Sequence, residues 1–346
     1  MSEAQTLEGG CLAVHDFGAF LGLHSERLQV RKGKQVQQEV PLLHLQHVLV
    51  VAGGVGVSSD VISACVERGI QITFLNFSGR PYAHIVSPAL SGTVRTRREQ
   101  LLAYNDRRGV ALAIAFAVGK LQSQANQLRY MAKYRKRKDR DLYRDARDGA
   151  IGLQVLADGL AALQNADCVD SVRAQIMNHE GRGAELYWQT LGKLLLADVD
   201  WDGRETRGAR DVVNSCLNYG YGILYAQVES AALLAGLDPY AGFLHVDRPG
   251  KPSLVLDLIE EYRVAVVDRV VFGLLNKGVR LEVDDQGMLT RDTRKTIADG
   301  VLARLEGRER YEKQKRMLRT ILQCQARHIA TFVRGEGPYR PFVCGW

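Results

Sequence analysis

Four residues whose types support acid–base or metal chemistry stand in two separate segments of the sequence. Glu180 lies in NHEGRGAELYW, and His245, Asp257 and Glu260 lie in GFLHVDRPGKPSLVLDLIEEY. Carboxylate oxygens with one imidazole nitrogen suit Mg²⁺ or Mn²⁺ better than a thiolate-loving metal. Such an ion polarises a phosphodiester and lowers the pKa of a bound water or a 3′-hydroxyl. These residue types therefore favour phosphodiester cleavage or transesterification.

The surroundings of Glu180 indicate a part-buried carboxylate on a helix. Gly181 and Gly183 follow it, and an interior glycine costs a helix about 1 kcal/mol relative to alanine, which indicates close approach by a neighbour. Tight helix packing alone explains these glycines equally well. Glu180 shares a helix face with Ala184 and Tyr187 by i, i+4 and i+7 spacing. A carboxylate on such a face needs a cation as its partner.

The second segment combines a loop histidine with two acids on a helix. His245 lies in a loop-rich passage, where a lone histidine is more often structural. Asp257 and Glu260 are spaced i and i+3 on a helix that begins at Ser253, so both project from one face near the positive end of the helix dipole. The general preference of acids for helix starts explains their presence but leaves their apolar neighbours unexplained.

The positive charge of the chain is concentrated in one stretch. The net charge is +7, and residues 95–148 carry 15 Lys and Arg against 6 Asp and Glu, which is +9. A charge run is usually a solvated face, but one that holds the whole surplus favours a polyanionic partner such as DNA. The predicted DNA-contacting residues are Arg135, Lys136, Arg137, Lys138 and Lys251.

The cysteine spacing, the first residues and the apolar stretches limit the class of protein that this chain can be. The six cysteines are far apart without a C-x-x-C pair, which argues against a zinc ribbon and indicates free thiols in a reducing cytoplasm. The first ten residues are polar and slightly acidic, unlike a secretion signal. The apolar stretches are shorter than the ~20 residues that span a bilayer, so no membrane segment is expected. We predict a cytoplasmic protein.

A glycine-rich loop between a strand and a helix imitates a dinucleotide site. Gly54 and Gly56 are followed by Ser59 where the G-x-G-x-x-G motif needs its third glycine. The next strand also lacks the terminal acid that holds a ribose. We predict no nucleotide site at this loop.

The hydrophobic period changes from two to 3.6 near residue 92, which predicts an α+β protein. A small, mostly β N-terminal domain is expected over residues 1–91, with one helix from Ser58 to Arg68. A larger all-α domain is expected over 92–334, and the tail 335–346 is given no structure. The predicted strands are 11–15, 20–24, 27–33, 46–53, 69–77 and 79–87. The predicted later helices are 96–127, 140–164, 169–197, 210–235, 253–276, 291–306 and 308–334.

Several separated motifs in this order resemble one known family. They are HEGRGAELYW at Glu180, the D-x-x-N of Asp211 and Asn214 running into NYGYGILY, GLDPYAGFLH ending at His245, and KPSLVLDLIEEYR. The chain resembles the CRISPR-associated endonuclease of spacer acquisition, Cas protein one. The resemblance implies that Glu180, His245 and Glu260 are metal ligands. It also implies that Asp257 is a nearby catalytic acid, concerned with a second metal or with proton transfer.

The resemblance further implies an activity and partners. The expected activity is metal-dependent DNA cleavage and integration, in which a prespacer 3′-hydroxyl attacks a phosphodiester of the CRISPR repeat. The expected partners are DNA, a second copy bound through the N-terminal domains, and a dimer of Cas protein two. Two alternatives are a non-enzymatic DNA-binding architectural protein with a structural ion site, and a metal phosphohydrolase of small metabolites. The extended basic stretch disfavours the latter.

Overall fold

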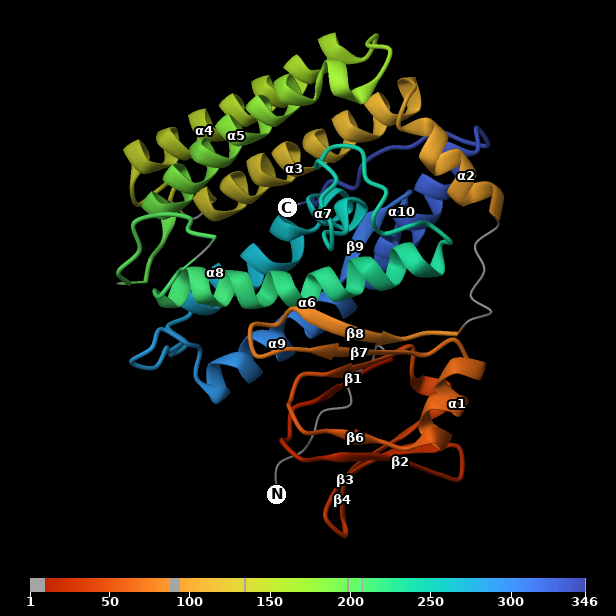
Figure 1. The fold of residues 1–346 in the computed structure, drawn as a ribbon. Helices are drawn as coiled ribbons and strands as arrows, with labels where there is room; N and C mark the ends of the chain where they lie inside the picture. The colour runs from red at the N-terminus through yellow and green to blue at the C-terminus, as the bar shows by residue number, and fades with distance from the viewer. Residues whose placement is uncertain (1–9, 88–93, 134, 198, 207, 346) are drawn as a thin grey trace.

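A computed structural model describes residues 10–87, 94–133, 135–197, 199–206 and 208–345 of this chain. A strand-rich N-terminal region is followed by a larger helical region, which confirms the predicted α+β class (Figure 1). The predicted boundary between residues 91 and 92 lies outside the described ranges.

The N-terminal region contains two four-stranded sheets. One sheet has the order β1 (Cys11–Val14), β5 (His47–Val50), β7 (Gln71–Leu75) and β8 (Pro81–Ile85). The other has the order β4 (Gln35–Pro41), β3 (Arg27–Lys32), β2 (Phe20–His24) and β6 (Gly56–Val57). Strands β4 and β6 were not predicted from the sequence. Pairing is parallel among β1, β5 and β7, and β8 adds an antiparallel edge.

Strand β5 is buried on both faces because two cores meet at its sheet. Val48 and Val50 pack into the core between the two sheets, whereas Leu49 packs into the core of the helical region. Alternate residues of a strand point to opposite faces. The unbroken apolar run at this position therefore reflects a strand covered on both sides.

The glycine-rich loop after β5 is shaped by aromatic packing. Gly54 has φ +66°, and a Cβ there would lie 3.3 Å from the Phe17 ring. A Cβ at Gly56 would lie 2.9 Å from the ring of Phe20. The loop leads into helix α1 (Ser59–Glu67), whose N-cap Ser58 accepts a hydrogen bond from a backbone N–H of the first turn. Aromatic packing thus accounts for both glycines of this loop.

The helical region is built around three long helices that pack together and a fourth that lies along the β7 and β8 side of the sheet (Figure 1). Helices α3, α4 and α5 form the first group, and α6 is the fourth. The α-helices of this region are α2 (Val94–Ala103), α3 (Arg107–Ala132), α4 (Arg140–Gly159), α5 (Arg173–Leu194), α6 (Val212–Leu234), α7 (Ser253–Ile259), α8 (Arg269–Asn276), α9 (Arg291–Glu306) and α10 (Leu318–Val333). Within the described ranges, none of these helices is both long and apolar enough to cross a bilayer.

Two predicted helices are each divided in the structure. The helix predicted over 96–127 is broken between α2 and α3, where Asp106 caps the start of α3 by accepting a hydrogen bond from a backbone N–H. The helix predicted over 253–276 is divided by a turn at residues 260–262, which a π-helical segment at Val264–Asp268 follows. Such π segments are rare and are frequent at functional sites.

The prediction of a helix over 308–334 is wrong for its first ten residues. Strands β9 (Arg308–Tyr311) and β10 (Gln314–Met317) form an antiparallel hairpin there. Its two-residue turn places Glu312 and Lys313 at φ 47° and 67°, as a type I′ turn requires. Helix α10 begins only after this hairpin.

The C-terminal tail, to which the sequence assigned nothing, is packed into the helical core. Phe342 is 3% exposed, and its ring stacks on Tyr262 with 5.1 Å between centroids. Its backbone N–H donates to Glu261 Oε2 at 2.8 Å. Asn126 of α3 donates to the carbonyl of Cys344 at 2.8 Å. The tail is therefore attached both to α3 and to the segment that follows α7.

Candidate active site

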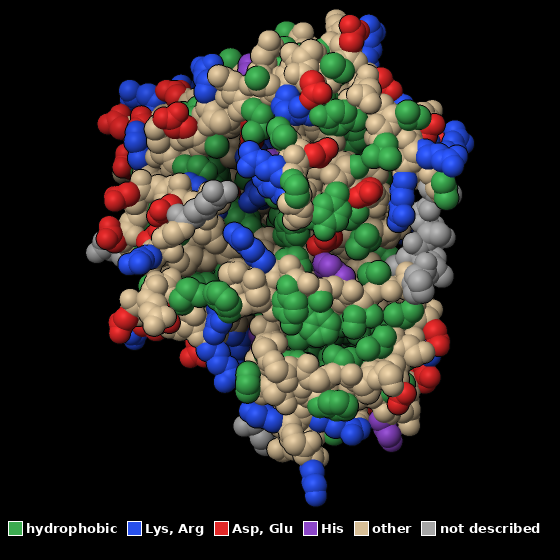
Figure 2. Space-filling view, viewed as in Figure 1, with side chains coloured by type: hydrophobic (Ala, Val, Ile, Leu, Met, Phe, Trp, Pro, Cys, Tyr) green, Lys and Arg blue, Asp and Glu red, His purple; other side chains and the backbone are tan. Residues whose placement is uncertain are grey.

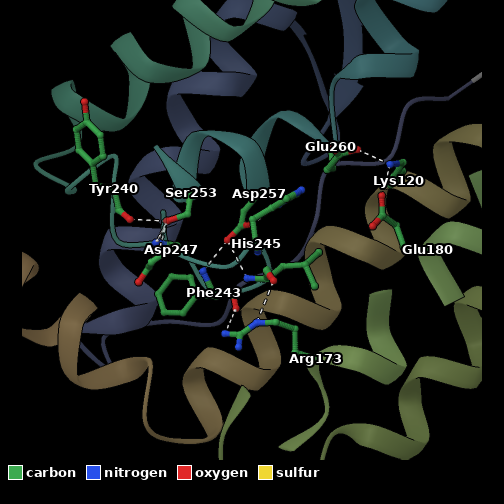
Figure 3. Close-up of polar contacts among 12 residues, drawn as sticks. Lys120, Arg173, Glu180, Tyr240, Phe243, His245, Asp247, Ser253, Asp257 and Glu260 are labelled. Carbon is green, nitrogen blue, oxygen red and sulfur yellow. Dashed lines mark hydrogen bonds and ion pairs between the residues drawn. The ribbon is translucent and has the colours of Figure 1, made fainter. Parts of the chain in front are cut away.

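Three helices and one loop bring the chemical groups of the site together (Figure 3). Helix α3 contributes Lys120, α5 contributes Glu180, and α7 contributes Asp257 and, at its C-cap, Glu260. The loop before α7 contributes His245. The structure places the four predicted residues in two contacting groups, Glu180 and Glu260 with Lys120, and His245 with Asp257.

The two glutamates converge on the ammonium group of Lys120. Lys120 Nζ donates a hydrogen bond to Glu180 Oε1 and lies 2.7 Å from Glu260 Oε2. These side chains are only 13%, 11% and 4% exposed, respectively. Burial acts to lower the pKa of Lys120, but the charges of Glu260 and Glu180 outweigh it and raise that pKa. The cation expected beside a part-buried Glu180 is therefore Lys120.

Glu260 is held from two sides by positive charge. Arg263 Nε donates to Glu260 Oε1 at 2.9 Å, and its guanidinium lies 4.6 Å from the centre of the Tyr221 ring. Burial acts to raise the pKa of Glu260, but Arg263 and Lys120 together lower it. Its Oε2 atom is buried and lies 2.7 Å from the ammonium nitrogen of Lys120.

The position of Glu260 differs from the sequence prediction. Helix α7 ends at Ile259, so Glu260 stands at the C-terminal end of a seven-residue helix rather than near its positive end. The helix dipole therefore does not stabilise this carboxylate. The ion pairs with Lys120 and Arg263 do so instead.

Asp257 fixes the loop that carries His245. Asp257 is fully buried, and its Oδ2 accepts hydrogen bonds from the N–H groups of Phe243 and Leu244 at 2.6 and 3.0 Å. Its Oδ1 lies 2.9 Å from the backbone nitrogen of His245 and 2.7 Å from His245 Nδ1. Because a carboxylate can only accept, Nδ1 carries the proton and donates it to Asp257. Nε2 is then the ring nitrogen that remains for a contact with another group. Metal-binding histidines are commonly oriented in this way.

The contact with Asp257 also shifts the pKa of His245. Burial acts to lower its pKa, while the hydrogen bond and charge of Asp257 outweigh burial and raise it. Glu260 and Glu180 act in the same direction. The imidazole thus faces a negative environment, which suits a cation near it.

Arg173 and Gly242 hold the same loop from other sides and were not predicted. Arg173 of α5 donates through Nε to the carbonyl of Leu244 at 3.1 Å and through Nη2 to that of Phe243 at 3.2 Å (Figure 3). A Cβ on Gly242 would lie 2.6 Å from the backbone of Ser253, so only glycine fits there. Arg173 precedes Glu180 by seven residues, a spacing that places both on one helix face and could have indicated it.

The residues present fit a divalent cation in their chemistry. Glu180 and Glu260 already share one buried cation position, which the Lys120 ammonium fills. Within the described residues no three His, Cys, Asp or Glu side chains stand close enough to hold a metal as they are. A metal at Glu180 and Glu260 would therefore require the Lys120 ammonium to move aside. His245 would supply the third ligand.

The predicted DNA contacts lie in two places. Lys136, Arg137 and Lys138 are exposed in the turn between α3 and α4, whereas Arg135 is partly buried and donates to a backbone carbonyl at the end of α5. Lys120 and the end of α3 are separated by 12 residues, or about 18 Å along a helix. Lys251 is exposed in the loop before α7, much nearer to the site along the chain.

The face of the molecule shown in Figure 2 is hollowed between the level of α3 and that of α6. Several Lys and Arg side chains gather around this hollow. A positive rim around a depression attracts polyanions and raises their local concentration.

The fold and the site together define an α+β protein whose helical region buries a cluster of two carboxylates, a lysine and a carboxylate-bound imidazole. A sequence model of the family described as CRISPR associated protein Cas1 matches residues 12–301. The chain belongs to this family, as the motifs indicated. The CRISPR-associated endonuclease Cas1 1 of Archaeoglobus fulgidus is 34% identical over 97% of this chain and 99% of its own length.

Solved structures share the fold. A casposase bound to integration product superposes with a TM-score of 0.76 at 20% identity, covering 96% of this chain and 92% of that chain. A chain of a Cas6-RT-Cas1–Cas2 complex superposes with a TM-score of 0.72 at 19% identity, covering 97% of this chain and 36% of that chain. At these identities the likeness establishes the architecture.

Proposed function

We propose that this protein is a metal-dependent DNA endonuclease and integrase of CRISPR adaptation, which joins prespacer DNA to the repeat array. One observation carries the proposal. Glu180 of α5 and Glu260 at the end of α7 meet at one buried cation position, and Asp257 holds His245 beside them (Figure 3). The similarity to endonucleases of the Cas1 family and to a casposase bound to integration product supports it.

Glu180, His245 and Glu260 would hold Mg²⁺ or Mn²⁺, which polarises the phosphodiester and lowers the pKa of the attacking hydroxyl. Asp257 keeps the imidazole in one tautomer and one orientation through its contact with Nδ1. The 3′-oxygen of the prespacer strand forms a bond to a phosphorus of the repeat and loses its proton. The bond from that phosphorus to the repeat 3′-oxygen breaks, and this leaving oxygen takes up a proton.

The proposed partners are DNA, a second copy of this chain and Cas2. A solved structure whose name includes Cas1 and Cas2 has the same fold, which supports Cas2 as a partner. Near the edge strand β8, Phe77 and Tyr82 are 63% and 66% exposed. Figure 2 shows hydrophobic side chains gathered at the level of this strand. An exposed apolar patch of this kind suits an interface between copies.

A strand-transfer assay with the partner Cas2 and a repeat-bearing plasmid tests the proposal. We expect Glu180→Gln, His245→Asn and Glu260→Gln each to abolish transfer while the circular dichroism spectrum stays that of the wild type. A chelator should abolish wild-type transfer as well. Glu185 is exposed on the same helix as Glu180, so Glu185→Gln is the matched control and should keep full activity.

Two outcomes would contradict this assignment. Unchanged transfer by all three site variants would remove the site from the reaction. DNA binding without strand cleavage under any divalent metal would favour the alternative, a DNA-binding architectural protein with a structural ion site.

A further inference from the structure

The outer face of the hairpin formed by β9 and β10 carries cations and no acid, whereas Glu309 and Arg316 pair on the other face. Opposite residues of an antiparallel pair point to the same side, and neighbours along a strand alternate. Arg310 pairs with Lys315 and Arg308 pairs with Met317, so Arg308, Arg310 and Lys315 share one face. All three are exposed, as is Lys313 at the turn.

The acids of the hairpin are already engaged elsewhere. Glu309 faces the protein and is ion-paired with Arg304 and with Arg269 at 3.7 Å. Glu312 lies 3.9 Å from Arg316. Within the described residues, no ion pair within 4 Å involves the four exposed cations. The positive charge of the outer face is therefore uncompensated by the protein.

This arrangement works against the stability of the hairpin. Arg310 and Lys315 stand directly opposite each other, and like charges in such a pair are destabilising. Lys313 has φ 67°, a conformation that disfavours residues other than glycine, asparagine and aspartate. Local rules of stability are most often broken where a surface has a function.

The hairpin is also connected to the candidate active site. Tyr311 of β9 donates to Gln325 Oε1 at 3.1 Å, and Gln325 Nε2 donates to Glu261 Oε2 at 3.1 Å. Glu261 is the residue after Glu260. Figure 1 shows β9 beside α10, the helix that carries Gln325. A polymer bound along the outer face would therefore lie against an element tied to the catalytic segment.

We propose that the outer face of this hairpin, formed by Arg308, Arg310, Lys313 and Lys315, binds the phosphate backbone of DNA. The inference rests on the proposed function, because it deepens how the same protein holds its DNA. Three cations on one face and a fourth at the tip form a positive surface that attracts the phosphates of a duplex. The contacts are to the backbone, so they are independent of base sequence.

The test is DNA binding by the full-length double variant Arg310→Thr/Lys315→Thr, measured at several salt concentrations on two duplexes of unrelated sequence. We expect weaker binding to both duplexes and a slope of log affinity against log salt that is shallower by about 1 for each cation removed. Thermal stability should stay equal or rise, since a like-charge pair is replaced by two residues that favour strands. A merely structural role would instead lower stability without changing the slope.

The matched control is Lys32→Thr/Lys34→Thr, which removes two exposed lysines from the turn of the β3–β4 hairpin. It makes the same change in net charge and should keep a slope close to that of the wild type. An unchanged slope in the Arg310 and Lys315 variant, or an equal loss in the control, would overturn the proposal. Loss of Cas2 retention with unchanged DNA binding would also overturn it, in favour of a protein partner.

The proposed function and the hairpin proposal are tested by different results. Strand transfer that persists in Glu180→Gln would contradict the active site whatever the hairpin variant does. Loss of salt-dependent binding in the hairpin variant alone leaves the active site untouched.

Discussion

Lys120 joins the two glutamates of the candidate site at the residue scale. Its ammonium lies between carboxylates that come from positions 60 and 140 residues further along the chain. Without it, Glu180 and Glu260 would be buried negative charges facing one another. Lys120 is therefore the counter-ion of the site in the absence of a metal.

We expect Lys120→Met to lower the free energy of unfolding by about 3–5 kcal/mol in the presence of a chelator. Removing one partner of a buried ion pair leaves an uncompensated charge, which costs that much. Mn²⁺ should restore more stability to the variant than to the wild type, because no ammonium competes for the carboxylates. Urea denaturation with chelator and with Mn²⁺ measures both effects.

The control for this variant is Lys193→Met. Lys193 pairs with Asp145, but both side chains are more than half exposed, and such surface pairs contribute roughly 0–1 kcal/mol. Equal stability of Lys120→Met and the wild type in chelator would show that the buried pair contributes nothing.

Four of the site residues could be predicted from the sequence segments in which they lie. The role of Lys120 could not, because its partners are distant in the sequence. The types and spacing of Glu180, His245, Asp257 and Glu260 indicated polar sites, and in the structure the two glutamates meet at Lys120 while Asp257 contacts His245. Lys120 had a weaker signal, since it is the lone charged residue between Arg108 and Arg129. Nothing local to α3 shows that two distant carboxylates meet there.

At the scale of elements, the wrong helix over 308–317 has a physical explanation. Its Arg, Glu, Lys, Gln and Met residues favour helices in isolation, so propensity extended α10 backwards. The hairpin is more stable here than a helix because β9 places Tyr311 against the core and Glu309 against Arg304. The +3 of residues 308–316 is also small beside the +9 of residues 95–148, so the charge pattern did not single out this segment.

No pattern in the sequence predicts the packed C-terminal tail. Its residues show no period, because each contact is made by a different group. Phe342 stacks on Tyr262, and Tyr339 donates to Glu261 Oε1 at 2.6 Å. Pro341 packs against Gly119, where a Cβ would lie 3.0 Å from it. The tail thus contacts Gly119 and Glu261, the residues next to Lys120 and Glu260 in the sequence.

We expect Phe342→Ala to lower the free energy of unfolding by about 3–5 kcal/mol, the usual cost of truncating a buried aromatic side chain. Urea denaturation of the full chain measures it. Leu196 is 62% exposed, so Leu196→Ala should change stability by no more than about 0.5 kcal/mol. Equal, small effects of both substitutions would mean that the tail adds no packing energy.

At the scale of the whole molecule, α6 joins the strand-rich region to the helical region through a row of polar contacts. Gln227 donates to His47 Nδ1 at 3.0 Å, and Ser230 donates to Gln71. Glu229 Oε2 lies 2.8 Å from His84 Nε2. Each pair links one turn of α6 to one strand of the sheet. The two regions are therefore held in register by directional contacts as well as by apolar packing.

His47 makes this junction sensitive to acid. It is buried, and burial lowers its pKa to about 3, with the positive charge of Arg319 acting in the same direction. Nδ1 accepts from Gln227, and Nε2 lies 2.8 Å from Thr73 Oγ1. Between the unfolded-state pKa of about 6.5 and the folded value, the unfolded chain binds a proton that the folded chain does not. Stability is therefore lost as pH falls from about 6.5 towards 3.

We expect the wild type to lose about 2 kcal/mol more stability than His47→Asn between pH 7 and pH 5, since each pH unit in this window contributes up to about 1.4 kcal/mol. Urea denaturation of both proteins at the two pH values gives the difference directly. His24 is exposed at the end of β2, so His24→Asn should keep the wild-type dependence. The variant will be less stable at pH 7 because it loses packing, and the comparison therefore rests on the change with pH. The same change with pH in the wild type and in His47→Asn would show that the junction between the two regions does not titrate through His47.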